Sequence, residues 1–87
     1  MSDNYIVDMT SDIIRNGRNL GTRNLIKDLS FETISSFIRD YIDKFGEPKI
    51  VMGTLLWIND VGDNYLMSIY KNEKPFNIER LSDILQE

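Results

Sequence analysis

The stretch SFETISSFIRDYIDKFG, residues 30–46, constrains the fold of this chain more than any other segment. Its apolar residues recur at spacings of three and four, which is the period of one face of an α-helix. Ser30 is a favourable N-cap, Glu32 suits the positive start of a helix, and Gly46 ends the pattern. We therefore predict an amphipathic helix over residues 30–45. Its apolar stripe must pack against another element and consists of Phe31, Ile34, Phe37, Ile38, Tyr41, Ile42 and Phe45.

A β-hairpin is predicted to follow this helix. In KIVMGTLLWINDVGDNYLMSIYKN, two apolar, β-prone runs flank the turn-forming sequence NDVGDN. They predict antiparallel strands over residues 49–58 and 65–71. Alternation along the first strand would place Val51, Leu55 and Trp57 on one face and Ile50, Met52, Leu56 and Ile58 on the other. Because both faces are apolar, this strand should either be central in its sheet or be covered on both sides.

A chain of 87 residues supplies few elements with which to cover both faces of that strand. One face is therefore a candidate surface for a partner, including a second copy of the chain. Trp57 and Tyr65, which both lie on the hairpin, are residue types that anchor protein interfaces. They are included among the predicted contact residues.

The last residues predict a second, short helix. In KPFNIERLSDILQE, Asn77 can cap a helix over residues 78–86. The apolar residues with helical spacing in this segment are Ile78, Leu81, Ile84 and Leu85.

The first thirty residues leave two alternatives open. Ser11 can cap a short helix, or Asn16-Gly17 can form the turn of a hairpin with strands over residues 5–15 and 22–29. Both alternatives place the Arg-Asn repeats at a bend or loop. Either way the chain is predicted to form a single α+β domain over residues 1–87, with an antiparallel hairpin or sheet packed against the two helices.

Residues 13–27 form one basic island in a chain whose net charge is −4, and they contain Arg15, Arg18, Arg23 and Lys27. The acidic total disfavours non-specific binding to nucleic acid or anionic lipid. The segment GRNLG matches no glycine-rich phosphate-binding pattern. We favour a polar loop whose arginines pair with acids such as Asp12 and Asp28. Contact with an acidic patch of a protein ranks second, and a nucleic-acid or nucleotide site third.

A helix-turn-helix is the structural alternative for this region. NLIKDL and TISSFIRDYI would be its two helices, and the hairpin after them would be the wing of a winged-helix nucleic-acid binder. The solvent face of the second helix sums to −1, however, and a helix that enters a DNA groove should not be acidic. The alternative function is therefore a nucleic-acid or nucleotide binder that uses the basic segment 15–27.

The residue types of the chain exclude most enzyme mechanisms. It has no histidine and no cysteine, so the commonest general base, metal ligands and nucleophile are missing. NDVGDN lacks the ligand spacing of a calcium loop. We predict no catalytic residue, no cofactor and no metal. No apolar run approaches the roughly 20 residues of a membrane span, and MSDNYIVDMTSD does not resemble a secretory signal, so a cytoplasmic location is expected.

These observations favour a small, acidic, non-enzymatic protein-binding module. It would be an inhibitor or regulator, of the kind found among viral accessory proteins, that occupies a surface of a larger protein. Acids on the helix suit a basic target, because complementary charge speeds encounter, and such targets are often nucleic-acid-binding proteins. Nucleic acid itself is disfavoured as a direct ligand. The predicted contact residues are Arg15, Arg18, Arg23, Lys27, Glu32, Asp40, Asp43, Glu47, Trp57 and Tyr65.

Overall fold

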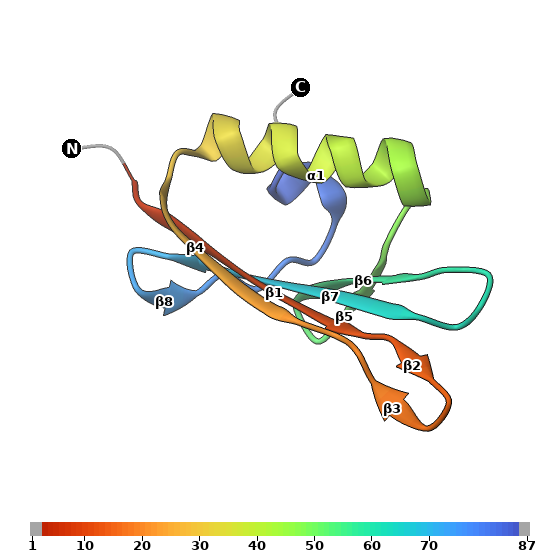
Figure 1. Ribbon diagram of the computed structural model, residues 1–87. Coiled ribbons are helices and arrows are strands. Elements are labelled where there is room, and N and C mark those ends of the chain that lie inside the picture. The colour runs from red at the N-terminus through yellow and green to blue at the C-terminus, as the bar shows by residue number, and fades with distance from the viewer. Residues whose placement is uncertain (1–2, 86–87) are drawn as a thin grey trace.

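The computed structural model describes residues 3–85 and has two layers (Figure 1). One layer is an antiparallel sheet with strand order β4-β1-β7-β6-β5, and β8 pairs with β7. The other contains α1 (Phe31–Phe45) and a single 3-10 turn, η1 (Leu81–Asp83). The predicted α+β class is confirmed. The strands are β1 Tyr5–Asp12, β2 Ile14–Arg15, β3 Arg18–Asn19, β4 Arg23–Leu29, β5 Lys49–Val51, β6 Thr54–Ile58, β7 Asn64–Lys71 and β8 Lys74–Pro75.

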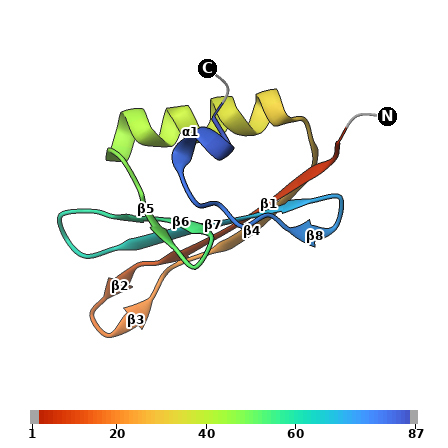
Figure 2. The same ribbon diagram turned by 180° about the vertical axis from the view of Figure 1, so that it is seen from behind.

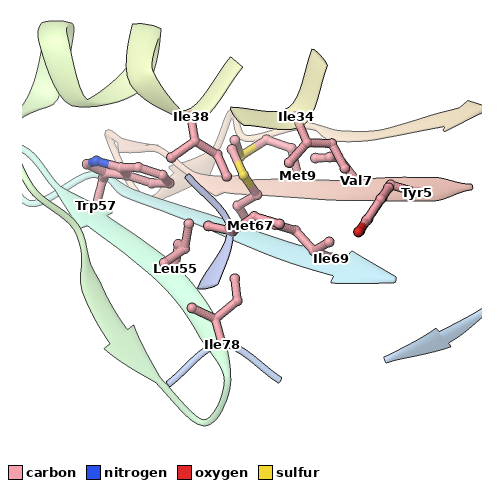
Figure 3. Packing of buried hydrophobic residues seen from close by; sticks show 11 residues of the cluster. Tyr5, Val7, Met9, Ile34, Ile38, Leu55, Trp57, Met67, Ile69 and Ile78 are labelled. Atoms are coloured by element: carbon pink, nitrogen blue, oxygen red, sulfur yellow. The ribbon is translucent and has the colours of Figure 1, made fainter. Parts of the chain in front are cut away.

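Helix α1 forms as its sequence predicts. The backbone N–H of Thr33 donates to the Ser30 hydroxyl at 3.2 Å, so the N-cap is in place. At the other end Gly46 has a φ of 86°, and its N–H donates to the carbonyl of Ile42 at 2.8 Å. That conformation favours glycine and ends the helix. Ile34 and Ile38 are completely buried and hold α1 against the sheet (Figure 3).

The N-terminal segment is a long hairpin, so the short-helix alternative is wrong. Asn16 and Gly17, with φ values of 52° and 75°, form the turn between β2 and β3. A two-residue turn of this kind needs positive φ at both positions and matches the twist of the strands. Below the turn, the N–H of Thr22 donates to the Ser11 hydroxyl at 2.9 Å, and the N–H of Ser11 donates to the carbonyl of Thr22 at 2.9 Å.

The predicted strand over residues 49–58 is in fact two strands. Met52 and Gly53, with φ values of 51° and 79°, form a second tight turn between β5 and β6. Val51 pairs with Thr54, and so lies on the opposite side of the sheet from Leu55. Placing Val51 with Leu55 was therefore wrong. The second predicted strand, residues 65–71, agrees with β7 to within one residue.

The predicted C-terminal helix over residues 78–86 is also wrong within the described residues. Only the single turn of η1 forms there, and residue 86 lies outside the described part of the chain. The Asp83 carboxylate accepts the backbone N–H groups of Glu79 and Arg80 at 3.1 and 3.2 Å. These bonds cap the start of η1, whereas Arg80 itself is extended, with φ −152° and ψ 158°, so no continuous helix runs through residues 78–85. Ile78 and Ile84 are nevertheless buried, as their apolar character requires.

The core lies between the sheet and α1 and fills only one side of the sheet (Figures 1 and 3). Strands β1, β7 and β6 contribute six of its buried residues: Val7, Met9, Leu55, Trp57, Met67 and Ile69. The chain after β8 crosses beneath α1 and adds Ile78 and Ile84 to the same side (Figure 2). Among residues 3–85, this one-sided core leaves the other side of the sheet without a covering layer.

Candidate interaction surfaces

The side of the sheet that faces away from α1 is called the open face below. No helix of residues 3–85 lies over it (Figures 1 and 2). Side chains alternate along each strand, so every second residue of the sheet points to this side. Its apolar residues are Ile6, Leu25, Val51, Leu56, Ile58, Leu66 and Tyr70. Leu25 and Ile58 are each 50% exposed, which is unusual for large aliphatic side chains in a sheet.

Sequence reasoning found part of this face. The alternation on residues 54–58 predicted two apolar sides for one strand, and Leu56 and Ile58 do lie on the side opposite Leu55 and Trp57. Of the two alternatives for this strand, β6 does lie inside the sheet, between β7 and β5, whereas covering on both sides is not met within the described residues. The contribution of Leu25 was missed, because the strand nature of β4 was left open.

One ion pair lies on the open face. The Arg23 guanidinium donates to both carboxylate oxygens of Asp8 at 3.1 and 2.9 Å. Asp8 is largely covered, whereas Arg23 remains 70% exposed. The pair borders a shallow hollow of about 300 Å³, which is also lined by Ile6, Leu25, Lys27, Tyr70 and Glu73.

Arg15 fastens the tip of the hairpin to the rest of the molecule. Its guanidinium donates to both oxygens of Asp63 at 2.8 and 2.9 Å, and the Asn59 side chain donates to the same carboxylate at 3.0 Å. These hydrogen bonds, with that from Arg15 the larger cause, lower the pKa of Asp63 from 3.8 to about 2. Arg15 therefore has a structural partner already.

Two of the three arginines pair with acids, as the favoured interpretation expected, but not with the acids that it named. Arg15 pairs with Asp63 and Arg23 with Asp8, whereas Asp12 accepts from the Asn19 amide at 3.2 Å. Arg18 and Lys27 form no ion pair with any described residue. The predicted basic island is thus divided between two structural pairs and two free cations.

The helix-turn-helix alternative is wrong. Residues 24–29, which would form its first helix, belong to strand β4 at the edge of the sheet. The second predicted helix, α1, packs against the same sheet that the hairpin belongs to. Segment 15–27 is therefore part of a β-hairpin and sheet edge and not part of a winged-helix DNA-binding domain.

The acidic residues predicted on the helix all lie at the surface. Glu32, Asp40, Asp43 and Glu47 are exposed, and none of them hydrogen-bonds or ion-pairs with another described residue. We call these four the acidic surface. Glu32 and Asp40 border a shallow hollow of about 420 Å³ together with Thr33, Ser36 and Phe37. Asp43 and Glu47 line a second hollow, of about 300 Å³, with Arg39, Ile42, Leu81 and Leu85.

Trp57 is a core residue and its prediction as a contact residue is corrected. It is only 2% exposed, and its indole N–H donates to the carbonyl of Gly46 at 2.9 Å. Tyr65 is half-buried and stacks on Phe45, with ring centroids 5.2 Å apart. Phe45, 42% exposed, is the more accessible aromatic at this edge.

Within the described residues, no three carboxylates come together as a metal site, and no helix has the length and hydropathy to cross a membrane. Comparison with protein-family models, with curated proteins and with solved structures finds no match to this chain.

Proposed function

We propose that this chain is a non-enzymatic protein-binding module that docks its acidic surface on a basic region of a larger protein. By occupying that region it would act as an inhibitor or regulator, and nucleic-acid-binding proteins are targets with the required charge. The observation that carries this proposal is that four carboxylates on and just after α1 have no side-chain partner among residues 3–85: Glu32, Asp40, Asp43 and Glu47.

Three acids elsewhere on the fold are held in ion pairs with basic side chains. Asp63 pairs with Arg15, Asp8 with Arg23, and Asp3 with Lys71. A carboxylate in such a pair has part of its field cancelled and must give up its partner to bind another cation. The four carboxylates of the acidic surface have no ion pair to break within residues 3–85 before they bind a cation. Uncompensated charge on one face accelerates encounter with a surface of opposite sign.

The hollow beside Glu32 and Asp40 has the chemistry to receive a basic side chain. Phe37 forms part of its lining and packs on Tyr41, with ring centroids 5.1 Å apart. A lysine or arginine of the partner would lay its aliphatic stem against the Phe37 ring and place its charged head near the two carboxylates. The aromatic contact adds apolar area to what would otherwise be a purely electrostatic encounter.

Capture from extracts of the source cells tests this function. The tagged chain is compared with Glu32→Gln/Asp40→Asn/Asp43→Asn and with the control Asp60→Asn/Glu73→Gln/Glu79→Gln, which makes the same change in charge on exposed residues elsewhere. We expect the wild type and the control to retain the same stoichiometric protein and the first variant to lose it. Retention should fall with salt, since surface charges are screened.

Two results would contradict the proposal. One is equal capture by all three chains, which would place the contact away from the acidic surface. The other is recovery of nucleic acid in place of protein, abolished by Arg18→Ala, which would favour the rival function of segment 15–27.

A further inference from the structure

We propose that the open face is covered by a second copy of the chain, so that two sheets pack face to face in a two-fold dimer. In this arrangement each α1 lies on the outside, and both acidic surfaces stay accessible. The dimer does not depend on the proposed function, because the two surfaces lie on opposite sides of the molecule (Figure 1).

The surface area of the isolated chain supports an uncovered interface. The chain exposes 6100 Å², whereas a folded monomer of its mass, 10.2 kDa, is expected to expose about 5,300 Å². The excess is about 800 Å², which is the share that each partner contributes to a stable interface of standard size.

The apolar residues of the open face are contiguous where a second sheet would pack. Leu56 lies directly opposite Leu66 across β6 and β7, and Ile58 is the next residue of β6 on that side. On β5, Lys49 lies opposite Leu56, and Val51, 41% exposed, lies diagonally from Leu56 and opposite Thr54. Two antiparallel sheets that interdigitate such strips form a sandwich about 10 Å thick. Met52, 95% exposed in the turn beside Val51, extends the apolar area at the rim.

The charge of the open face suits a copy of itself better than a strongly charged partner. Three cations and three carboxylates point to this side or line its hollow: Arg23, Lys27, Lys49, Asp8, Asp12 and Glu73. They sum to zero, so the net charge of −4 resides elsewhere on the chain. Two copies can therefore approach through this face without like-charge repulsion.

Pairing through the sheet edges is the less favourable way to make a dimer. Strand β4 forms one edge of the sheet and carries the charged residues Arg23 and Lys27. Its register with β1 also shifts near Asp28, which has a φ of 60°. Charged residues and bulges of this kind prevent strand addition. The opposite edge strand, β5, contains only three residues. The second copy is therefore placed on the face and not at an edge.

Sedimentation equilibrium over a concentration series tests the dimer with Leu66→Lys and its control Leu20→Lys. Leu66 is central on the open face, and Leu20 is 57% exposed near the hairpin tip. We expect the wild type and Leu20→Lys to reach twice 10.2 kDa and Leu66→Lys to remain at the monomer mass with an unchanged circular dichroism spectrum. A monomeric wild type at high concentration overturns the proposal, as does equal dimerisation of both variants.

A second measurement keeps the test independent of the folding of Leu66→Lys. The chain has no cysteine, so Ser68→Cys carries a single spin label on the open face and Ser36→Cys carries one on the outer side of α1. Two labels in one dimer give a dipolar coupling, and we expect a shorter distance from position 68 than from position 36. Absence of coupling from both positions, or a shorter distance from position 36, contradicts the face-to-face arrangement. A third outcome also contradicts the dimer: the wild type is monomeric and captures a larger protein, and Leu66→Lys no longer captures it. That result would assign the open face to the captured protein.

Discussion

The Arg15 guanidinium and the Asp63 carboxylate, 48 residues apart in sequence, meet through two hydrogen bonds of 2.8 and 2.9 Å. This pair joins the tip of the first hairpin to the loop between β6 and β7. The carboxylate also accepts from Asn59, and its side chain is only 6% exposed. A buried carboxylate needs such compensation, because without hydrogen bonds its charged form would be unfavourable.

We predict that acid weakens the fold through Asp63. Its pKa is about 2 in the folded chain and 3.8 in the unfolded reference, so the unfolded state takes up the proton first as pH falls. The stabilisation is complete above pH 4 and is lost progressively towards pH 2. Thermal unfolding at several pH values should show a steeper loss of Tm in this window for the wild type than for Arg15→Ala. Equal slopes would mean that Arg15 does not set the pKa.

Gly21 is predicted to tolerate no side chain. A Cβ atom there would fall on the carbonyl oxygen of Ser11 and lie 2.6 Å from its carbon. We expect Gly21→Ala to force the strands apart where Ser11 pairs with Thr22, at a cost of about 1–3 kcal/mol in the free energy of unfolding. Urea denaturation measures this value. Gly17→Asn, in open space at a positive φ that asparagine tolerates, is the matched control and should change stability little.

Ile34 is predicted to be a main contributor to the docking of α1. It is completely buried, so Ile34→Ala should lower the free energy of unfolding by about 2–5 kcal/mol. Ile14, on β2, is 56% exposed, and Ile14→Ala should change the same quantity by less than about 0.5 kcal/mol. Comparable losses at the two positions would contradict the one-sided core.

Met52 is predicted to be a poor residue for its own turn. Its φ of 51° lies in the left-handed region, where asparagine is favoured before glycine in two-residue hairpin turns. Met52→Asn should therefore raise the free energy of unfolding by about 0.5–1 kcal/mol. Met52→Val, with a branched side chain that opposes positive φ, should lower it. If both substitutions have the same sign in urea denaturation, the turn conformation is wrong.

Local signals predicted the elements that depend on neighbouring residues. The cap at Ser30, the helical period and Gly46 together gave α1, and Asn16-Gly17 gave one of the two alternatives for the first hairpin. The Met52-Gly53 turn was missed because methionine is not typical of positive φ and the apolar run continues through it. At the C-terminus, the helical spacing of the apolar residues gave no sign that the backbone at Arg80 is extended, which limits the helical structure to the single turn η1.

The candidate surfaces depend on long-range pairing and were less predictable. No local pattern tells that Arg15 meets Asp63 or that Arg23 meets Asp8. The acidic residues of α1 were predictable as a surface because the helical period alone decides which residues point outward. The open face required the strand order, since Leu25 and Leu66 reach the same side only after β4, β1 and β7 have paired.

The hydrogen bond from Trp57 to the Gly46 carbonyl gives this chain a spectroscopic reporter of its own. Trp57 is the only tryptophan, it lies on β6, and its indole is held at the C-terminal end of α1. Its fluorescence should therefore shift to longer wavelength when the helix separates from the sheet, even if the strands remain paired. Comparing tryptophan emission with the β-sheet signal in circular dichroism would show whether the two layers part together or in sequence, without any added label.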